Sequence, residues 1–190
     1  MEYIRDRLHP RLRALGQELA ARLESRTGVE LRCQLRSGRW HRNPWATWVS
    51  VVAAAETERS DPNRPRLSVF MDGDEVIAGY CQSIWRKRWR EVVRRKGLAE
   101  VIDEVAKKGR LKIGIAHWEE GVRRTIQYRS GKRALEAAAE LGQDFFVVGR
   151  TYLWPDKEPL VCSARFLEEV DAVFAAAWPV YHLAFFGERA

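Results

Sequence analysis

Residues 66–81, RLSVFMDGDEVIAGYC, contain two apolar runs on either side of the acidic segment Asp72-Gly73-Asp74. Short runs rich in β-branched and aromatic residues are typical of strands, and an Asp-Gly step between two such runs favours a tight turn. The stretch therefore predicts an antiparallel hairpin with strands at residues 66–71 and 75–81. Antiparallel pairing is thus the expected basis of the sheet in this half of the chain.

An amphipathic helix and two further strands are predicted before the hairpin. Leucines recur at spacings of three and four, with Arg and Glu between them, at Leu12, Leu15, Leu19 and Leu23. Pro10 suits the first turn of this helix, and Gly28 suits its end. Residues 29–35, VELRCQL, alternate as a strand, and a second strand is predicted at residues 45–52. The first half therefore reads as a helix followed by an antiparallel meander.

The second half alternates between helical and strand patterns. A helical period appears at residues 83–96, SIWRKRWREVVRRK, where two tryptophans four residues apart form an apolar stripe. Further helices are predicted at 98–108 and 131–141, and strands at 111–116, 122–128 and 144–153. Ser163 is a natural cap for a closing helix at residues 163–178. These elements predict an α+β fold, with an antiparallel or mixed sheet of about five to seven strands packed by an N-terminal, a central basic and a C-terminal helix.

Length and charge limit the classes of function. At 190 residues the chain is long enough for one substantial core, and a single domain spanning residues 1–190 is expected. The formal net charge of +7 favours an anionic partner, which could be nucleic acid, a membrane surface or an acidic protein. On charge alone, a basic protein without such a partner is an equal alternative.

Cysteine usage and hydropathy predict the compartment. The cysteines, Cys33, Cys81 and Cys162, are odd in number and widely spaced, which argues against a disulfide framework and a CxxC metal site. The N-terminal residues are charged from the first turn, unlike a signal peptide. No uncharged apolar run reaches the roughly 18 residues that span a bilayer. We therefore expect a soluble cytoplasmic protein with no membrane partner, no metal and no cofactor.

Signatures of catalysis are weak. Ser130-Gly131-Lys132 is not a phosphate-binding loop, because Ile126 stands where that motif needs glycine. The histidines are scattered, at His9, His41, His117 and His182, without the spacing of a zinc site. Acidic residues that could hold a catalytic metal, such as Asp72, Asp74 and Glu119, are more simply charges on turns. We expect no enzymatic activity, and a metal-dependent nuclease using these acids is the first alternative function.

The segment at residues 83–96 is unusually basic. It carries seven Arg or Lys but one acid, Glu91, so that its cations repel one another and gain little from pairing. An anion lying over such a helix would relieve this repulsion, and nucleic-acid phosphate is the natural candidate. The residues predicted to contact phosphate are Arg36, Arg42, Arg86, Lys87, Arg90 and Arg94. A protein-interaction domain that presents this helix to an acidic partner is the second alternative.

Residues 38–48, GRWHRNPWATW, supply aromatic rings as well as cations. Stacking of a base on an aromatic side chain contributes about 1–3 kcal/mol. Because one face of the strand that follows must pack, we expect one tryptophan in the core and assign it to Trp48. Trp45 is a candidate for both packing and a base pocket. Trp40, with Arg39, is the part of the segment most expected to meet a ligand.

The segments at residues 31–51 and 65–80 together resemble the N-terminal DNA-binding domain of McrB-type methylation-dependent restriction proteins. In that family a strand ends in a small-residue turn with Gly and an aromatic, and a Pro-Trp pair opens the next strand. A hairpin of the pattern D-E-L/V-x-L-A-Y-G follows. Gly38, Pro44-Trp45 and residues 74–80 stand at the matching places in this sequence.

The resemblance implies a non-catalytic α+β domain that binds double-stranded DNA and extrudes a methylated cytosine into an aromatic-lined pocket. Taken position by position, the pocket residues that it implies are Arg39, Trp40, Trp45, Arg66, Ser68 and Phe70. Arg39 directly follows the glycine where the family has a ring, so Trp40 would take the place of that ring. The resemblance further implies a nuclease or NTPase effector as an attached domain or a partner subunit.

Overall fold

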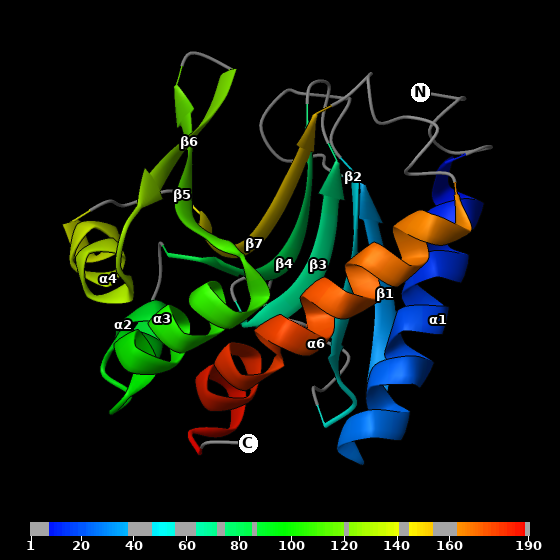
Figure 1. Ribbon diagram of the computed structural model, residues 1–190, viewed down its shortest axis with the longest axis horizontal. Helices are drawn as coiled ribbons and strands as arrows, with labels where there is room; N and C mark the ends of the chain where they lie inside the picture. The colour runs from blue at the N-terminus through cyan, green and yellow to red at the C-terminus, as the bar shows by residue number, and fades with distance from the viewer. Residues whose placement is uncertain are drawn as a thin grey trace.

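The computed structural model describes residues 8–37, 47–55, 64–71, 75–84, 87–119, 122–140, 145–153 and 163–188. Within them the strands form one seven-stranded sheet in the order β1-β2-β3-β4-β7-β5-β6, with every neighbouring pair antiparallel (Figure 1). The strands are β1 Leu31–Ser37, β2 Thr47–Ala53, β3 Arg66–Met71, β4 Glu75–Ser83, β5 Lys112–Glu119, β6 Val122–Tyr128 and β7 Phe145–Leu153. The helices are α1 His9–Thr27, α2 Lys87–Val93, α3 Leu98–Gly109, α4 Gly131–Glu140 and α6 Ala164–Phe186. The predicted α+β class is confirmed.

The predicted hairpin is present as β3 and β4. Its register pairs Val69 with Ala78 and Leu67 with Tyr80, and all four side chains are buried on the same face of the sheet. The turn at residues 72–74 lies outside the described residues. Since β2 pairs with β3 and β1 with β2, the first half forms the predicted meander. β4, however, pairs on its other side with β7, a pairing that the local pattern does not indicate.

Two helices, α1 and α6, cover one face of this sheet (Figure 1). α1 packs on β1 and β2, while α6 packs on β3, β4 and β7 and lies against α1. The buried stripe of α6 includes Val170, Phe174 and Ala177, which belong to the same apolar cluster as Val49 and Val69 of the sheet. This cluster is the main core of the protein, and it lies on the helix side of the sheet.

α6 begins as predicted but ends later. The Ser163 hydroxyl accepts a hydrogen bond from the Phe166 N–H at 3.2 Å, which confirms it as the N-cap. The predicted end at residue 178 is wrong, because the helix continues through Pro179 to Phe186. The buried Tyr181 explains this extension, since its hydroxyl accepts a hydrogen bond from the Ala53 N–H at the end of β2. No helix in the described ranges, α6 included, is long and apolar enough to cross a membrane.

The basic segment forms a shorter helix than predicted. Among the described residues of this segment, 87–93 are helical, while Ser83 still belongs to β4 and a turn follows Val93. Arg95, in this turn, donates to the carbonyl oxygens of Leu183 and Phe185 at 2.8 and 3.3 Å. A cation at the C-terminal end of a helix is favourable, so Arg95 stabilises the last turn of α6. The prediction of one continuous helix over residues 83–96 is therefore wrong.

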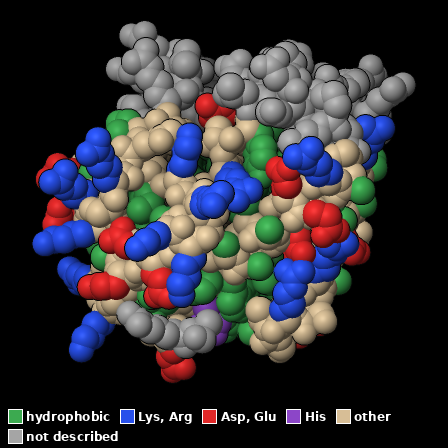
Figure 2. All heavy atoms as spheres, viewed as in Figure 1, with side chains coloured by type: hydrophobic (Ala, Val, Ile, Leu, Met, Phe, Trp, Pro, Cys, Tyr) green, Lys and Arg blue, Asp and Glu red, His purple; other side chains and the backbone are tan. Residues whose placement is uncertain are grey.

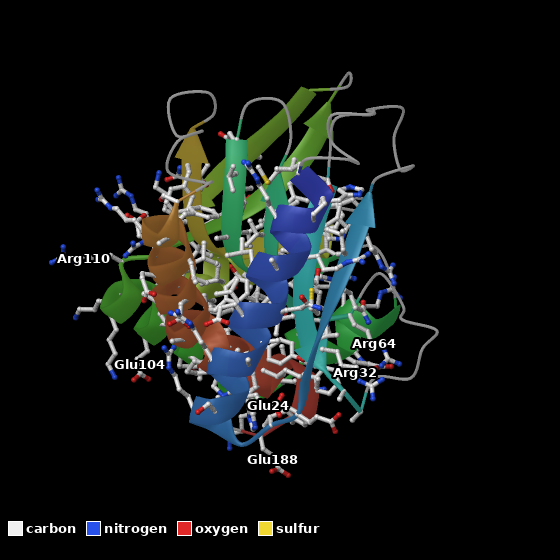
Figure 3. All side chains as sticks on the ribbon, turned by 90° about the vertical axis from the view of Figure 1, so that its right-hand side faces the viewer. Glu24, Arg32, Arg64, Glu104, Arg110 and Glu188 are labelled. Atoms are coloured by element: carbon white, nitrogen blue, oxygen red, sulfur yellow. The ribbon has the colours of Figure 1, made fainter. Side chains whose placement is uncertain are left out.

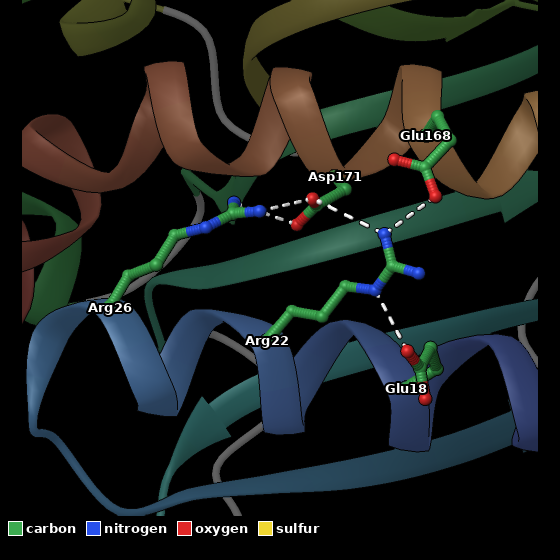
Figure 4. Close-up of polar contacts among 5 residues, drawn as sticks. All are labelled: Glu18, Arg22, Arg26, Glu168 and Asp171. Carbon is green, nitrogen blue, oxygen red and sulfur yellow. Dashed lines mark hydrogen bonds and ion pairs between the residues drawn. The ribbon is translucent and has the colours of Figure 1, made fainter.

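An ion cluster joins α1 to α6 around one buried carboxylate (Figure 4). Asp171 is 4 % exposed, and Arg26 donates to both its oxygens at 2.9 and 2.5 Å. Arg22 lies 3.6 Å from the same carboxylate and also pairs with Glu18 and Glu168. The hydrogen bond to Asp171 raises the pKa of Arg26. The two arginines remain partly exposed, so the buried acid is the member of the cluster that depends on its partners.

We expect Arg26→Met to lower the free energy of unfolding by about 3 kcal/mol, because it leaves the buried Asp171 carboxylate without its two-point partner. Adding Asp171→Leu should restore most of this loss, since a buried ion pair replaced by apolar side chains is often neutral. Urea unfolding of the single and double variants measures both effects. Glu169→Gln is the matched control, because its 3.1 Å pair with Arg165 is on the surface. A Met variant as stable as the wild type would contradict this assignment.

Candidate nucleic-acid interface

The face of the sheet turned away from α1 and α6 carries the candidate site. Side chains alternate between the two faces of a strand, so every second residue of β1, β2 and β3 points away from the helices. We call these residues the nine-residue face: Arg32, Gln34 and Arg36 of β1, Trp48, Ser50 and Val52 of β2, and Arg66, Ser68 and Phe70 of β3. In Figure 3, Arg32 lies on the side of the sheet opposite α6, together with Arg64.

The strand register arranges the nine-residue face as three rungs across the sheet. The aromatic rung is Arg36, Trp48 and Phe70, which pair directly with one another. The hydroxyl rung is Gln34, Ser50 and Ser68, paired in the same way. The arginine rung is Arg32, Val52 and Arg66, at the far end of the three strands. Neighbouring rungs are two residues, or about 7 Å, apart along each strand.

The aromatic rung presents a platform. The Trp48 and Phe70 rings are stacked, with centroids 5.8 Å apart and planes 25° apart, and both side chains are partly exposed. A flat ring inserted between them would need about 7 Å, twice an ordinary carbon–carbon contact. The two rings therefore form one wall with no room for a third ring between them, and Arg36 stands opposite Trp48 in the register of β1 and β2.

The hydroxyl rung is polar, and its two serines are almost completely buried. Ser50 and Ser68 are 1 % and 2 % exposed, and their hydroxyl oxygens are 2.9 Å apart in a hydrogen bond. On the opposite face of the same strands, Val49, Val51 and Val69 enter the main core. Polar side chains at the centre of the nine-residue face are thus a property of this face and not of the sheet as a whole.

The arginine rung adds positive charge. The Arg32 side chain is 57 % exposed, and its nearest acid is Glu30 at 3.9 Å. Arg66 is only 9 % exposed, and its Nε donates to the carbonyl oxygen of Arg64 at 3.4 Å. With Arg36, the nine-residue face holds three arginines and no acidic residue. On the helix side of the protein, by contrast, Lys and Arg side chains are interspersed with Asp and Glu (Figure 2).

The cations of α2 lie beyond the same end of the sheet. β4 runs antiparallel to β3 and leads into α2 at the end of the sheet where the arginine rung lies. Trp89 and Val92 are buried, which confirms the predicted apolar side of the helix. Arg90 and Arg94 are exposed. Trp89 packs on Phe146 in the main core, however, so α2 belongs to the helix side of the sheet and not to the nine-residue face.

The structure brings together part of the predicted site. Of the predicted pocket residues, Arg66, Ser68 and Phe70 share the nine-residue face, while Arg39, Trp40 and Trp45 lie outside the described residues. The predicted phosphate contacts divide in the same way. Arg36 is on the nine-residue face, Arg90 and Arg94 are exposed, Arg42 and Arg86 lie outside the described residues, and Lys87 begins α2 without a described side chain.

The prediction that Trp48 belongs to the core is wrong. Its ring is partly exposed and lies opposite the helix-packed face, where Val49 and Val51 provide the core of β2. Two further residues of the nine-residue face, Ser50 and Arg32, were not predicted as site residues. Strand alternation had placed Trp48 and Ser50 on one face, but it does not say which face the helices cover. The polar residues at alternate positions of β1, Arg32, Gln34 and Arg36, were the signal that could have identified the face without helices.

For the alternative function as a nuclease, the structure describes none of the predicted acidic side chains. Asp72 and Asp74 lie outside the described residues, and the side chain of Glu119 is not described. Among the described side chains, no group of three His, Cys, Asp or Glu could hold a metal ion. At the start of α4 the Gly131 N–H donates to Asp103 at 2.6 Å, and the Arg133 N–H donates to the Ser130 hydroxyl at 3.4 Å. Side chains thus take the place that a phosphate would have at this helix end.

One thiol close to the candidate site has a raised pKa because it is partly buried. Cys33, on the helix side of β1, is half-buried, and this burial raises the pKa of its thiol. The neutral thiol therefore packs with the core instead of adding charge to the nine-residue face.

Compared with known proteins, the chain matches no protein-family model, and no curated protein matches its sequence.

Proposed function

We propose that this protein is a non-catalytic DNA-binding module that reads a modified cytosine, with methylcytosine as the first candidate. The observation that carries the proposal is the nine-residue face, on which a stacked Trp48–Phe70 pair shares one side of the sheet with three arginines. The rings provide a surface for a base extruded from the duplex, and the arginines provide contacts for phosphate. A nuclease or NTPase effector would act on the DNA that this module has bound.

The free energies of base flipping and stacking favour separate roles for the rings and the arginines. Extruding a base costs a few kcal/mol of lost stacking and pairing. Stacking on an aromatic platform returns about 1–3 kcal/mol, so base flipping needs additional contacts with the backbone. The net charge of +7 and the arginine rung can supply such contacts without reading sequence. Affinity is then expected to come mainly from the cations, and selectivity from the platform.

The test is a binding titration of a duplex that carries one methylcytosine against the same duplex without the modification, at about 50 and 200 mM salt. We expect tighter binding of the modified duplex and a steep fall in affinity with salt. Arg32→Gln should reduce the slope of log affinity against log salt concentration by about one, the change expected when one phosphate contact is lost. The matched control is Arg165→Gln, another exposed arginine, which lies at the start of α6 and should leave the slope unchanged.

Each result of this titration has a distinct reading. Equal affinities for the two duplexes would remove the modified base and leave general DNA binding. No binding at low salt would remove nucleic acid altogether and favour an acidic protein as the partner of this surface. Magnesium-dependent cleavage of the labelled duplex would contradict the non-catalytic assignment and favour the nuclease.

A further inference from the structure

The Ser50–Ser68 pair has one hydroxyl proton more than it can use. Each serine hydroxyl carries one proton, and the single hydrogen bond between the two oxygens consumes one of the two. Whichever serine accepts that bond must direct its own proton elsewhere. In the part of the chain that the structure describes, neither side chain has another hydrogen-bond partner. One O–H donor of the pair is therefore left over.

Bulk water cannot satisfy this donor, because the serines are 1 % and 2 % exposed. Buried donors in native proteins are almost always paired with a protein group, an ordered water or a ligand. The donor lies on the nine-residue face, since Ser50 and Ser68 point to the same side of the sheet as Trp48 and Phe70. The unused proton and the partly exposed aromatic platform are thus on neighbouring rungs, about 7 Å apart along the strands.

We infer that this unused hydroxyl proton is a specificity element that donates to a hydrogen-bond acceptor on the edge of the bound base. The inference rests on the proposed function, since it takes the base to lie on the Trp48–Phe70 wall. Cytosine, methylated or not, has a carbonyl oxygen and a ring nitrogen that can accept such a bond once its pairing partner is removed. Because the pair is buried, binding has to open the surface above it before the edge of the base can accept this bond, and the exposed Arg32 has to exchange its Glu30 partner for phosphate.

The paired arrangement makes an unusual prediction for single substitutions. In Ser50→Ala the remaining Ser68 hydroxyl has no serine to bond to, and its proton becomes free to donate to the base. In Ser68→Ala the Ser50 hydroxyl is released in the same way. Each single variant should therefore bind the modified duplex within about twofold of the wild type. The double variant has no donor and should bind about tenfold more weakly, the effect expected for one hydrogen bond with a buried group left unmade.

The experiment measures binding of the methylcytosine duplex by the wild type, both single variants and the double variant, with urea unfolding of each as the control for folding. Near-normal single variants and a weak double variant support the inference. A double variant with wild-type affinity overturns it and assigns the unused proton to an ordered water. Losses that simply add between the two singles overturn it as well, because they show that each serine acts on its own.

A second arm leaves the protein unchanged and alters the base. Duplexes are prepared with analogues of the read base that lack the carbonyl oxygen or the ring-nitrogen acceptor. One of the two analogues should bind the wild type about tenfold more weakly than the parent base. Equal binding of both analogues and the parent would overturn the inference even if the double variant does not fold. If the wild type prefers the modified duplex but neither experiment gives its expected result, only this inference is wrong. If the wild type binds modified and unmodified duplexes equally, the proposed function is wrong too.

Discussion

Gly149→Ala is expected to lower the free energy of unfolding by about 4 kcal/mol, which is exceptional for the addition of one methyl group. Gly149 lies directly opposite Gly79 in the pairing of β4 with β7. A Cβ atom at Gly149 would overlap the carbonyl oxygen of Ala78 and stand 3.0 Å from the Gly79 Cα. These are backbone atoms of a central strand pair, so they cannot move aside as a flexible side chain could. The two strands would have to separate.

A second glycine separates this steric effect from backbone strain. Gly28, at the end of α1, has a φ of 69° but no atom within 4 Å of its missing Cβ. Gly28→Ala should therefore lose only about 1 kcal/mol, the cost of a left-handed conformation for a residue with a side chain. Gly149 lacks a positive φ, so its effect is steric alone. Urea midpoints measure both variants, and a Gly149→Ala protein as stable as Gly28→Ala would show that the β4–β7 pairing is wrong.

This strand pair matters to the candidate site as well as to the fold. The register continues the hydroxyl rung across the sheet, from Ser68 to Gly79 and from Gly79 to Gly149. On the same face, Ile77, Cys81 and Val147 form a small apolar cluster of their own. The nine-residue face is therefore one end of a larger surface, held in place by the close approach of β4 and β7.

Local pattern predicted the elements better than it predicted their partners. The hairpin of β3 and β4 follows from two apolar runs around Asp-Gly, and α3 and α4 follow from helical periodicity. The β4–β7 pairing joins residues more than sixty positions apart, for instance Gly79 and Gly149, and nothing near either glycine specifies the other. The late end of α6 has the same origin, because Tyr181 is held by the distant Ala53 N–H.

In the candidate site too, the local pattern predicts which residues share a face of the sheet but not which face the helices cover. Alternation along β2 and β3 correctly groups Ser68 with Phe70, and Trp48 with Ser50. It gives no sign of which group faces the helices, and burial of a large ring made the core the better expectation for Trp48. Only the packing of α1 on the opposite face of β2 places Trp48 in the candidate site. The predicted roles of Arg39, Trp40 and Trp45 stay predictions.

Trp48→Ala is expected to reduce binding of the methylcytosine duplex by roughly 10- to 100-fold, because it removes the larger half of the platform. Binding of the unmodified duplex should change far less, since the arginines are intact, so that the preference for the modified base disappears. Trp48→Phe keeps a ring beside Phe70 and should lose only part of that preference. Phe186→Ala is the matched control, because this ring is 40 % exposed at the far end of α6.

The stability of the same variants decides between a platform and ordinary packing. Trp48 is partly exposed and lies outside the main core, so its truncation should cost less than the 3–5 kcal/mol expected for a fully buried tryptophan such as Trp89. A Trp48→Ala protein that unfolds would show that the ring is packing, and one that folds and still prefers methylcytosine would show that the base lies elsewhere. A folded variant that binds both duplexes equally leaves one explanation: the exposed faces of Trp48 and Phe70 are where the two bases are told apart.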